Sequence, residues 1–360
     1  TDNIHLLFDD CSLNGIELLG PDINLSEFKF MPVTQKEILY GLGGLKGTGL
    51  SAIDVILEER NENGPFLSLF DFTSRLDLRK VNRRAIESLI RAGAFDKLNS
   101  NRASLLASVN LAISLADQAN ANLGQNSLFA EADTQKINLI EMAPWEDKQQ
   151  LSEEKIAIGF YFSGHPFKFY QKIISGFVSE NLSDLKPRES SYLIAGIISA
   201  IRIRMTSRGK IAIVTLDDGK ARIEMFVGNA VLNEAQSLLK EDQLLIAEGK
   251  VSHDDFSGGN RVSAIKVYDL MSIQSSKAAL LTISMNGQAD AKKLKVLLRP
   301  YSRENFHTSL KRCKVKVEYQ NSNGKVELLL GPEWDVSLHE DLISGLSKSF
   351  HDENVKILYN

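Results

Sequence analysis

The chain contains 360 residues, of which 43% are hydrophobic and 24% charged, and its formal net charge is −4. These values are ordinary for globular protein and allow about two to four domains. They exclude a globally basic surface, so a nucleic-acid contact has to come from local patches and backbone amides. The two cysteines, Cys11 and Cys313, are far apart in sequence, which argues against a zinc motif or a disulfide framework and is typical of the reducing cytoplasm. No apolar run approaches the roughly 18 residues of a membrane span, so we expect no membrane contact.

Residues 1–32 are predicted to form a short strand and an extended segment that ends at Pro32. The chain starts at Thr1, without a methionine, in sequence that resembles the interior of a protein. We therefore expect the chain to be a piece of a longer protein.

The stretch Ile38–Leu57 has the sequence ILYGLGGLKGTGLSAIDVIL. It predicts a helix that ends near Leu45, a tight glycine turn, and a second helix that begins at about Leu50. Glycines in the turn permit positive φ or a close approach of the backbone. The unpaired amides at the start of the second helix suit a phosphate oxygen.

The pattern apolar-x-Gly-Thr-Gly-x-x-Ala is that of the helix-hairpin-helix motif, which grips the nucleic-acid backbone without reading bases. A helix–glycine–helix corner without a ligand is the alternative. Another amphipathic helix, Val81–Phe95, follows and favours the binding motif. The residues predicted to contact a DNA backbone at the first turn are Leu45, Lys46, Gly47, Thr48 and Gly49.

Helical periodicity continues from Arg102 to about Ala119, and the chain then becomes polar. Inside this loop lies the segment QNSLF, in which Gln125, Ser127, Leu128 and Phe129 match a sliding-clamp peptide, Gln-x-x-Leu-Phe. The glutamine would orient the peptide and the two apolar side chains would fill a pocket, each contributing roughly 1.5–3 kcal/mol. Ordering the peptide on binding costs part of this energy, so the remaining affinity is weak enough for the clamp to be released. The alternative is that Leu128 and Phe129 only pin the loop onto the core.

Residues 191–272 change to a period of two and predict five strands, with a helix at Asn229–Leu239 between the third and the fourth. This is the order of an oligonucleotide-binding (OB) barrel. Basic residues near the first strand and two phenylalanines are candidates for contacts with single-stranded DNA. A solvated edge and core packing are the alternatives. These candidates are Arg202, Arg204, Arg208, Lys210, Phe226 and Phe256.

A linker at Ser272–Lys277 is expected to lead into a small α/β domain at 277–360, which has a hairpin turn at Asn323-Gly324. Trp334 is either an interface anchor or a core residue. His165 in Gly-His-Pro is interpreted as part of a turn. The predicted fold class is therefore multidomain α+β, with a helical region, a five-stranded OB barrel and a small C-terminal α/β domain.

Three segments, YGLGGLKGTGLSAI, GPFLSLFDF and VNRRAIESLIRAGAFD, stand in this order in the chain. They resemble the C-terminal half of the alpha subunit of bacterial replicative DNA polymerase III. GIELLGPDIN, GFYFSGHPF, TLDDG, SHDDFSGG and PEWDVSLHEDLISGLS extend the resemblance over essentially the whole chain. Gly20 departs from it, because this family usually has a proline there. The second hairpin also departs, since its turn lacks Gly-x-Gly, and phosphate contact there would depend on Lys80, Arg83 and Arg84.

The resemblance implies an order of parts along the chain: the end of the fingers domain at 1–32, tandem hairpins for duplex DNA at 33–119, the clamp-binding loop and connecting helices at 120–190, the barrel near single-stranded template at 191–272, and a tau-binding domain at 277–360 in which Trp334 is the contact candidate. The implied partners are DNA, the beta sliding clamp, the tau subunit of the clamp loader and the rest of the polymerase holoenzyme.

The resemblance also implies that the full protein is a DNA-directed DNA polymerase whose palm holds two Mg²⁺ ions on three aspartates. Those aspartates belong to sequence that precedes Thr1, and no Asp-x-Asp pattern replaces them. We therefore expect no catalytic residue, metal or cofactor in this fragment, and no polymerase activity from it alone.

Three alternatives stay open. A DNA repair protein, such as a ligase or nuclease, also combines hairpins with such barrels, although a bacterial ligase should carry a four-cysteine zinc site. An RNA-binding module would leave the hairpins and QNSLF without a role. An error-prone polymerase paralogue is the third alternative, and the tau-contacting terminus favours the replicative branch over it.

Overall fold

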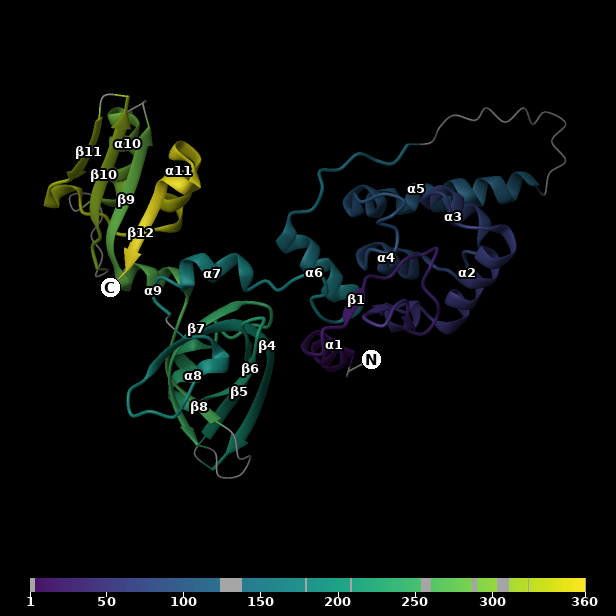
Figure 1. The fold of residues 1–360 in the computed structure, drawn as a ribbon, viewed down its shortest axis with the longest axis horizontal. Coiled ribbons are helices and arrows are strands. Elements are labelled where there is room, and N and C mark those ends of the chain that lie inside the picture. The colour runs from purple at the N-terminus through teal and green to yellow at the C-terminus, as the bar shows by residue number, and fades with distance from the viewer. Residues whose placement is uncertain are drawn as a thin grey trace. The chain divides into compact units, whose positions relative to one another are not determined.

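The structure is a computed structural model that describes residues 4–123, 138–178, 180–207, 209–253, 260–286, 290–302, 311–322 and 324–359. It divides into two compact units, Thr1–Pro166 and Phe167–Asn360, and each is described by itself (Figure 1). In the described residues no helix has the length and apolar character needed to cross a membrane.

The first unit opens with a helix that the sequence analysis did not predict, α1 (Ile4–Leu13). A small three-stranded sheet follows, in the order β1-β3-β2, with β1 (Glu17–Leu19) parallel to β3 (Glu37–Leu39) and β2 (Met31–Pro32) antiparallel to it. The predicted short strand near residue 17 is thus confirmed.

The helix predicted to end near Leu45 does not form. Residues Leu42–Gly44 make only a single 3₁₀ turn after β3. The amides of Leu42 and Gly43 donate to the carbonyls of Glu27 and Phe28 instead, at 2.8 and 2.9 Å. Because a Cβ on Gly41 would lie 2.4 Å from the backbone of Lys29, the glycines serve this close approach of two chain segments, and glycine is also a poor helix former.

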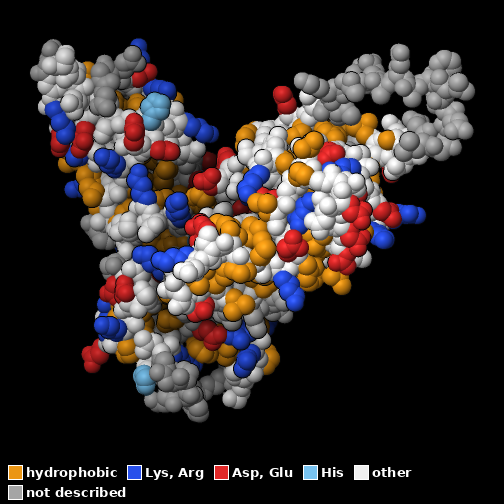
Figure 2. Space-filling view, turned by 45° about the vertical axis from the view of Figure 1, so that its right-hand side comes forward, with side chains coloured by type: hydrophobic (Ala, Val, Ile, Leu, Met, Phe, Trp, Pro, Cys, Tyr) orange, Lys and Arg blue, Asp and Glu red, His pale blue; other side chains and the backbone are white. Residues whose placement is uncertain are grey.

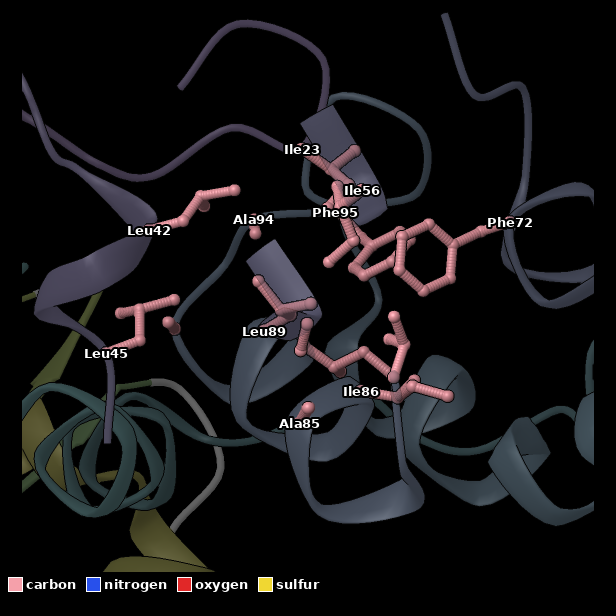
Figure 3. Packing of buried hydrophobic residues seen from close by; sticks show 14 of the residues in the cluster. Ile23, Leu42, Leu45, Ile56, Phe72, Ala85, Ile86, Leu89, Ala94 and Phe95 are labelled. Carbon is pink, nitrogen blue, oxygen red and sulfur yellow. The ribbon is translucent and has the colours of Figure 1, made fainter. Parts of the chain in front are cut away.

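The remaining elements described in the first unit are helices. Its cluster of buried side chains joins the helices to the glycine turn, and Figure 3 shows Leu42, Leu45, Ile86 and Leu89 in this core. Side chains of Ser68 and Asn82 cap the N-termini of α3 and α4 by accepting from Asp71 N and Ala85 N. The helices are α2 (Leu50–Asn63), α3 (Leu69–Arg75), α4 (Arg83–Arg91), α5 (Arg102–Leu123) and α6 (Asp147–Ile158).

The second unit contains a closed five-stranded barrel in the order β4-β5-β6-β8-β7. Helix α8 (Asn229–Ala235) lies between β6 and β7 in the chain, so the OB arrangement is confirmed. Apolar side chains at alternate positions fill the barrel because successive residues of a strand point to opposite faces. The strands are β4 (Tyr192–Thr206), β5 (Gly209–Asp217), β6 (Arg222–Val227), β7 (Leu244–His253) and β8 (Asn260–Tyr268).

Two helices flank the barrel in the chain, α7 (Lys168–Ile174) and α9 (Leu270–Lys277). The predicted linker at Ser272–Lys277 is therefore wrong, because these residues belong to α9. Asp269 caps this helix by accepting from Ser272 N, and Ser275 Oγ donates to Leu338 O at 3.1 Å. The polar residues of the supposed linker thus make specific contacts, which a hydrophobic pattern does not reveal.

The C-terminal domain has a four-stranded sheet in the order β11-β10-β9-β12. The hairpin between β10 and β11 is confirmed by the pairing of Asn321 with Gly324, whereas the last strand, β12, was not predicted. The elements are β9 (Ala278–Asn286), α10 (Ala291–Leu298), β10 (Lys314–Asn321), β11 (Gly324–Leu329), α11 (Glu340–Phe350) and β12 (Val355–Tyr359). The described part of the second unit also has four 3₁₀ turns, at Leu182–Asp184, Arg299–Tyr301, Pro332–Trp334 and Asp352–Asn354.

Candidate nucleic-acid interface

The glycine turn before α2 presents a run of unpaired backbone amides. Gly47 has φ +86°, which favours glycine, and Gly49 is the N-cap of α2. Thr48 Oγ1 closes the turn by donating to Leu45 O at 2.9 Å. Within the described residues, the N–H groups from Gly47 to Ser51 have no acceptor. The start of α2 therefore has the partial positive charge and the donors that suit a phosphate.

Leu45 and Lys46, both predicted to contact DNA, each use their backbone amide inside the protein. Leu45 is only 3% exposed and its amide donates to Leu42 O at 3.2 Å, so its side chain and amide are engaged inside the protein, and its contact with DNA stays a prediction. The amide of Lys46 is also used, because it donates to Ala157 O of α6 at 2.7 Å. The side chain of Lys46 is exposed, which places a positive charge next in sequence to the unpaired amides.

Helix α4 of the second hairpin packs directly on this turn. Ser88 Oγ donates to Lys46 O at 2.6 Å. A Cβ on Gly47 would lie 3.3 Å from Nε of Arg84, so the exposed Arg84 side chain lies alongside the glycine turn. The two hairpins thus build one composite site, with amides from the first and a guanidinium group from the second, which is a favourable set of donors for a phosphate.

The turn of the second hairpin carries less unpaired positive charge, because two of its arginines form ion pairs with acidic side chains. Arg83 Nε pairs with Glu87 at 2.6 Å, while Lys80 is exposed before α4. Sequence reasoning missed Arg79, which is 91% exposed and pairs with Asp77 at 3.0 Å. The hydrogen bond from Arg79 lowers the pKa of the Asp77 carboxyl. Its position in the turn before a helix N-terminus was the signal that could have identified Arg79.

On the barrel, Arg202, Arg204 and Lys210 are exposed and Phe226 is half-buried. Phe226 lies outside the barrel core, since its neighbours Met225 and Val227 point inward. The guanidinium group of Arg261 stacks on its ring at 4.1 Å from the centroid, a residue that the sequence analysis did not select. Arg208 and Phe256 lie outside the described residues.

The remaining candidates are the residues predicted to bind the sliding clamp, the tau subunit or a metal ion. Gln125, Ser127, Leu128 and Phe129 lie outside the described residues. Trp334 is half-buried and packs against the core of the C-terminal domain. Among the described residues, no group of three His, Cys, Asp or Glu side chains is placed to hold a metal ion.

Positive and negative side chains are interspersed on the face of the molecule shown in Figure 2, in keeping with the net charge of −4. The face shown is therefore not broadly basic, and the candidate site consists of local backbone amides beside Lys46 and Arg84.

Two family models match the chain: the helix-hairpin-helix motif over residues 15–105 and the OB-fold nucleic acid binding domain over residues 192–270. DNA polymerase III subunit alpha from Neisseria meningitidis serogroup A is 38% identical over 361 residues. The same subunit from Escherichia coli K12 is 35% identical over 371 residues. These alignments cover 99% and 100% of this chain.

The chain is homologous to a region of the DNA polymerase III alpha subunits. It spans 31–32% of the length of these two alpha subunits. The second OB-fold domain of replication protein A from Methanococcus maripaludis has 18% identity and a TM-score of 0.21, and the match covers 25% of this chain and 91% of that one. The barrel topology and the family model over residues 192–270 identify the OB fold.

Proposed function

We propose that this chain is the DNA- and clamp-tethering part of a replicative DNA polymerase III alpha subunit. The observation that carries the proposal is the composite site at the start of α2, where unpaired amides lie beside Lys46 and Arg84. Backbone donors and guanidinium groups bind phosphates of any sequence. A replicative polymerase needs this kind of grip because it must hold duplex product at every position along the template.

The other parts of the proposal follow from the homology to alpha subunits and from sequence motifs. The barrel binds single-stranded template, Gln125–Phe129 binds the beta sliding clamp, and the C-terminal domain with Trp334 binds tau. The whole protein synthesises DNA in the cytoplasm with Mg²⁺ held in a palm domain that is not part of this chain, and this chain alone is inactive.

The hairpin site is tested by changing Lys46 and Arg84 together to alanine. Each phosphate contact contributes about 0.9 to the slope of log affinity against log salt, so we expect the slope for duplex DNA to fall by about 1.8. The weakening should be similar for duplexes of different sequence, because backbone contacts carry no base information. Fluorescence anisotropy with a labelled duplex over a salt series measures both quantities.

The matched control is the double variant Lys29→Ala/Lys36→Ala, which removes two exposed charges from the region of the three-stranded sheet. It should leave the slope nearly unchanged. An equal loss in both double variants would show that only net charge matters, and an unaltered slope in Lys46→Ala/Arg84→Ala would contradict the proposed site.

The clamp contact is tested with the triple variant Gln125→Ala/Leu128→Ala/Phe129→Ala. We expect binding of the chain to its cognate sliding clamp, measured by surface plasmon resonance, to fall below detection, because the apolar anchors carry most of the energy of such a peptide. Duplex binding by the hairpins should be retained. If clamp binding survives in the triple variant, or is absent from the unaltered chain, QNSLF is not the clamp peptide.

A further inference from the structure

The outer surface of the barrel carries a continuous row of side chains that the strand register defines. Successive partners across the strands are Arg202 on β4, Ile213 on β5, Phe226 on β6 and Ser263 on β8. Ile213 does not belong to the barrel core, yet it is only 6% exposed. The outer surface of the barrel is therefore covered at Ile213, and Arg202 and Phe226 are its partners on either side in the row.

Two positions on this row are already occupied by the protein's own groups. Arg202 reaches over β5 and forms an ion pair with Glu224, two residues before Phe226 on β6. Arg261 on β8 stacks on the Phe226 ring at 4.1 Å from its centroid. By contrast, the exposed Arg204 has no ion-pair partner among the residues that the structure describes.

We propose that Glu224 takes the place of a DNA phosphate on Arg202 and limits the affinity of the barrel for single-stranded DNA. A carboxylate and a phosphate oxygen accept from a guanidinium group in the same way. The phosphate of a bound strand would take the place of the Glu224 carboxylate on Arg202, beside the Phe226 ring on which the guanidinium group of Arg261 is stacked. This inference rests on the proposed binding of single-stranded template by the barrel.

The exposure of the ion pair makes this exchange feasible. Arg202 and Glu224 are 53% and 48% exposed, so their attraction is weakened by solvent and is readily replaced. The exchange also has a cost, because the displaced carboxylate remains near the incoming phosphate. A barrel with this built-in competitor releases single strands more easily than one with an unpaired arginine, which suits a polymerase that moves along its template.

The test is the variant Glu224→Gln in the full chain, with a labelled oligo(dT) as the probe. We expect affinity at low salt to rise about two- to fivefold, the range of an exposed ion pair, and the salt slope to steepen by about 0.7 for one added contact to a single strand. The matched control Glu234→Gln, on the exposed side of α8, makes the same change in net charge. It should leave both quantities nearly unaltered.

A double variant, Arg202→Gln/Glu224→Gln, should abolish the gain, because the proposed effect acts through Arg202. Equal gains in Glu224→Gln and Glu234→Gln, or no gain in Glu224→Gln, would overturn the inference.

The variant Phe226→Leu separates this inference from the proposed function. If Phe226→Leu weakens oligo(dT) binding while Glu224→Gln changes nothing, the barrel binds single strands and only the role of Glu224 is refuted. If the unaltered chain does not bind oligo(dT) and Glu224→Gln does not either, both the binding role of the barrel and this inference fail. Circular dichroism of each variant checks that the barrel is folded.

Discussion

Replacing Glu154 with alanine is expected to lower the free energy of unfolding of the first unit by about 3 kcal/mol or more, the cost of leaving a buried charge without its partner. Glu154 is 1% exposed on α6. Its Oε1 accepts from Nη1 of Arg102 at 2.9 Å, and its Oε2 accepts from N and Oγ of Ser163 at 3.0 and 2.9 Å. One carboxylate therefore ties together α5, α6 and the segment before residue 166.

The change removes one of the two carboxylates that pair with Arg102. The arginine side chain is 10% exposed and also pairs with Asp96 at 2.6 Å. Burial opposes its charge, but the hydrogen bonds and charges of Asp96 and Glu154 outweigh this effect, so the pKa of Arg102 is raised. With Glu154 removed, Asp96 and the carbonyl oxygen of Arg91, which accepts from Nη1 at 3.2 Å, still compensate the buried guanidinium group, which places the expected loss near the lower end of the range for broken buried pairs, about 3 kcal/mol.

Urea denaturation followed by circular dichroism measures the loss. The control is Glu87→Ala, whose partner Arg83 is 61% exposed, and for which we expect a change of at most about 0.5 kcal/mol. The double variant Arg102→Met/Glu154→Leu should recover part of the stability, because it removes both buried charges together. A loss below about 1 kcal/mol for Glu154→Ala would contradict the expected cost of a buried unpaired charge.

The change also bears on the interface. Ala157 on the same helix accepts the amide of Lys46 at 2.7 Å, so α6 supports the glycine turn from behind. The sequence gives no sign of this support, because more than one hundred positions separate the two residues. Local patterns located the turn and the beginning of α2 at Leu50 correctly. Tertiary packing, which these patterns do not show, occupies the amide of Lys46 and leaves the amides that follow it unpaired.

The difference between local sequence patterns and tertiary packing also explains the wrong prediction of a helix ending near Leu45. The glycine-rich stretch before Leu45 has apolar residues at helical spacing, and the pattern therefore predicted a helix. The carbonyls of Glu27 and Phe28 instead accept from the amides of Leu42 and Gly43, so a hydrogen-bonding partner distant in sequence prevailed over a weak local preference for helix.

In the barrel, the period of two and the turn residues identified all five strands and the helix between the third and the fourth. The pairs that organise the outer surface were not predictable in the same way. Arg261 reaches Phe226 because β6 and β8, which are not consecutive, pair in parallel. Arg202 reaches Glu224 across β5. Such contacts depend on strand register, which the sequence pattern alone does not specify.

Replacing Phe72 with alanine is the second change with a large expected effect, a loss of about 3–5 kcal/mol in the free energy of unfolding of the first unit. Phe72 is fully buried on α3 and makes edge-to-face contacts with Phe66 and Phe95, with ring centroids 4.9 and 5.1 Å away. Figure 3 shows the rings of Phe72 and Phe95 together in the core. Each aromatic pair adds about 0.5–1.5 kcal/mol to the cost of the lost buried surface.

The loss of Phe72 should act on DNA binding only through folding. Urea denaturation gives the stability, and Leu67→Ala, at a side chain 76% exposed in the adjoining loop, should change it by no more than about 0.5 kcal/mol. At a temperature where part of the Phe72→Ala population is unfolded, the apparent affinity for duplex DNA should fall with the folded fraction.

The salt slope of the folded fraction should stay the same, because the amides, Lys46 and Arg84 are intact. A reduced slope in Phe72→Ala would instead show that the core residue shapes the phosphate contacts directly, and the separation between the core and the interface in this unit would not hold.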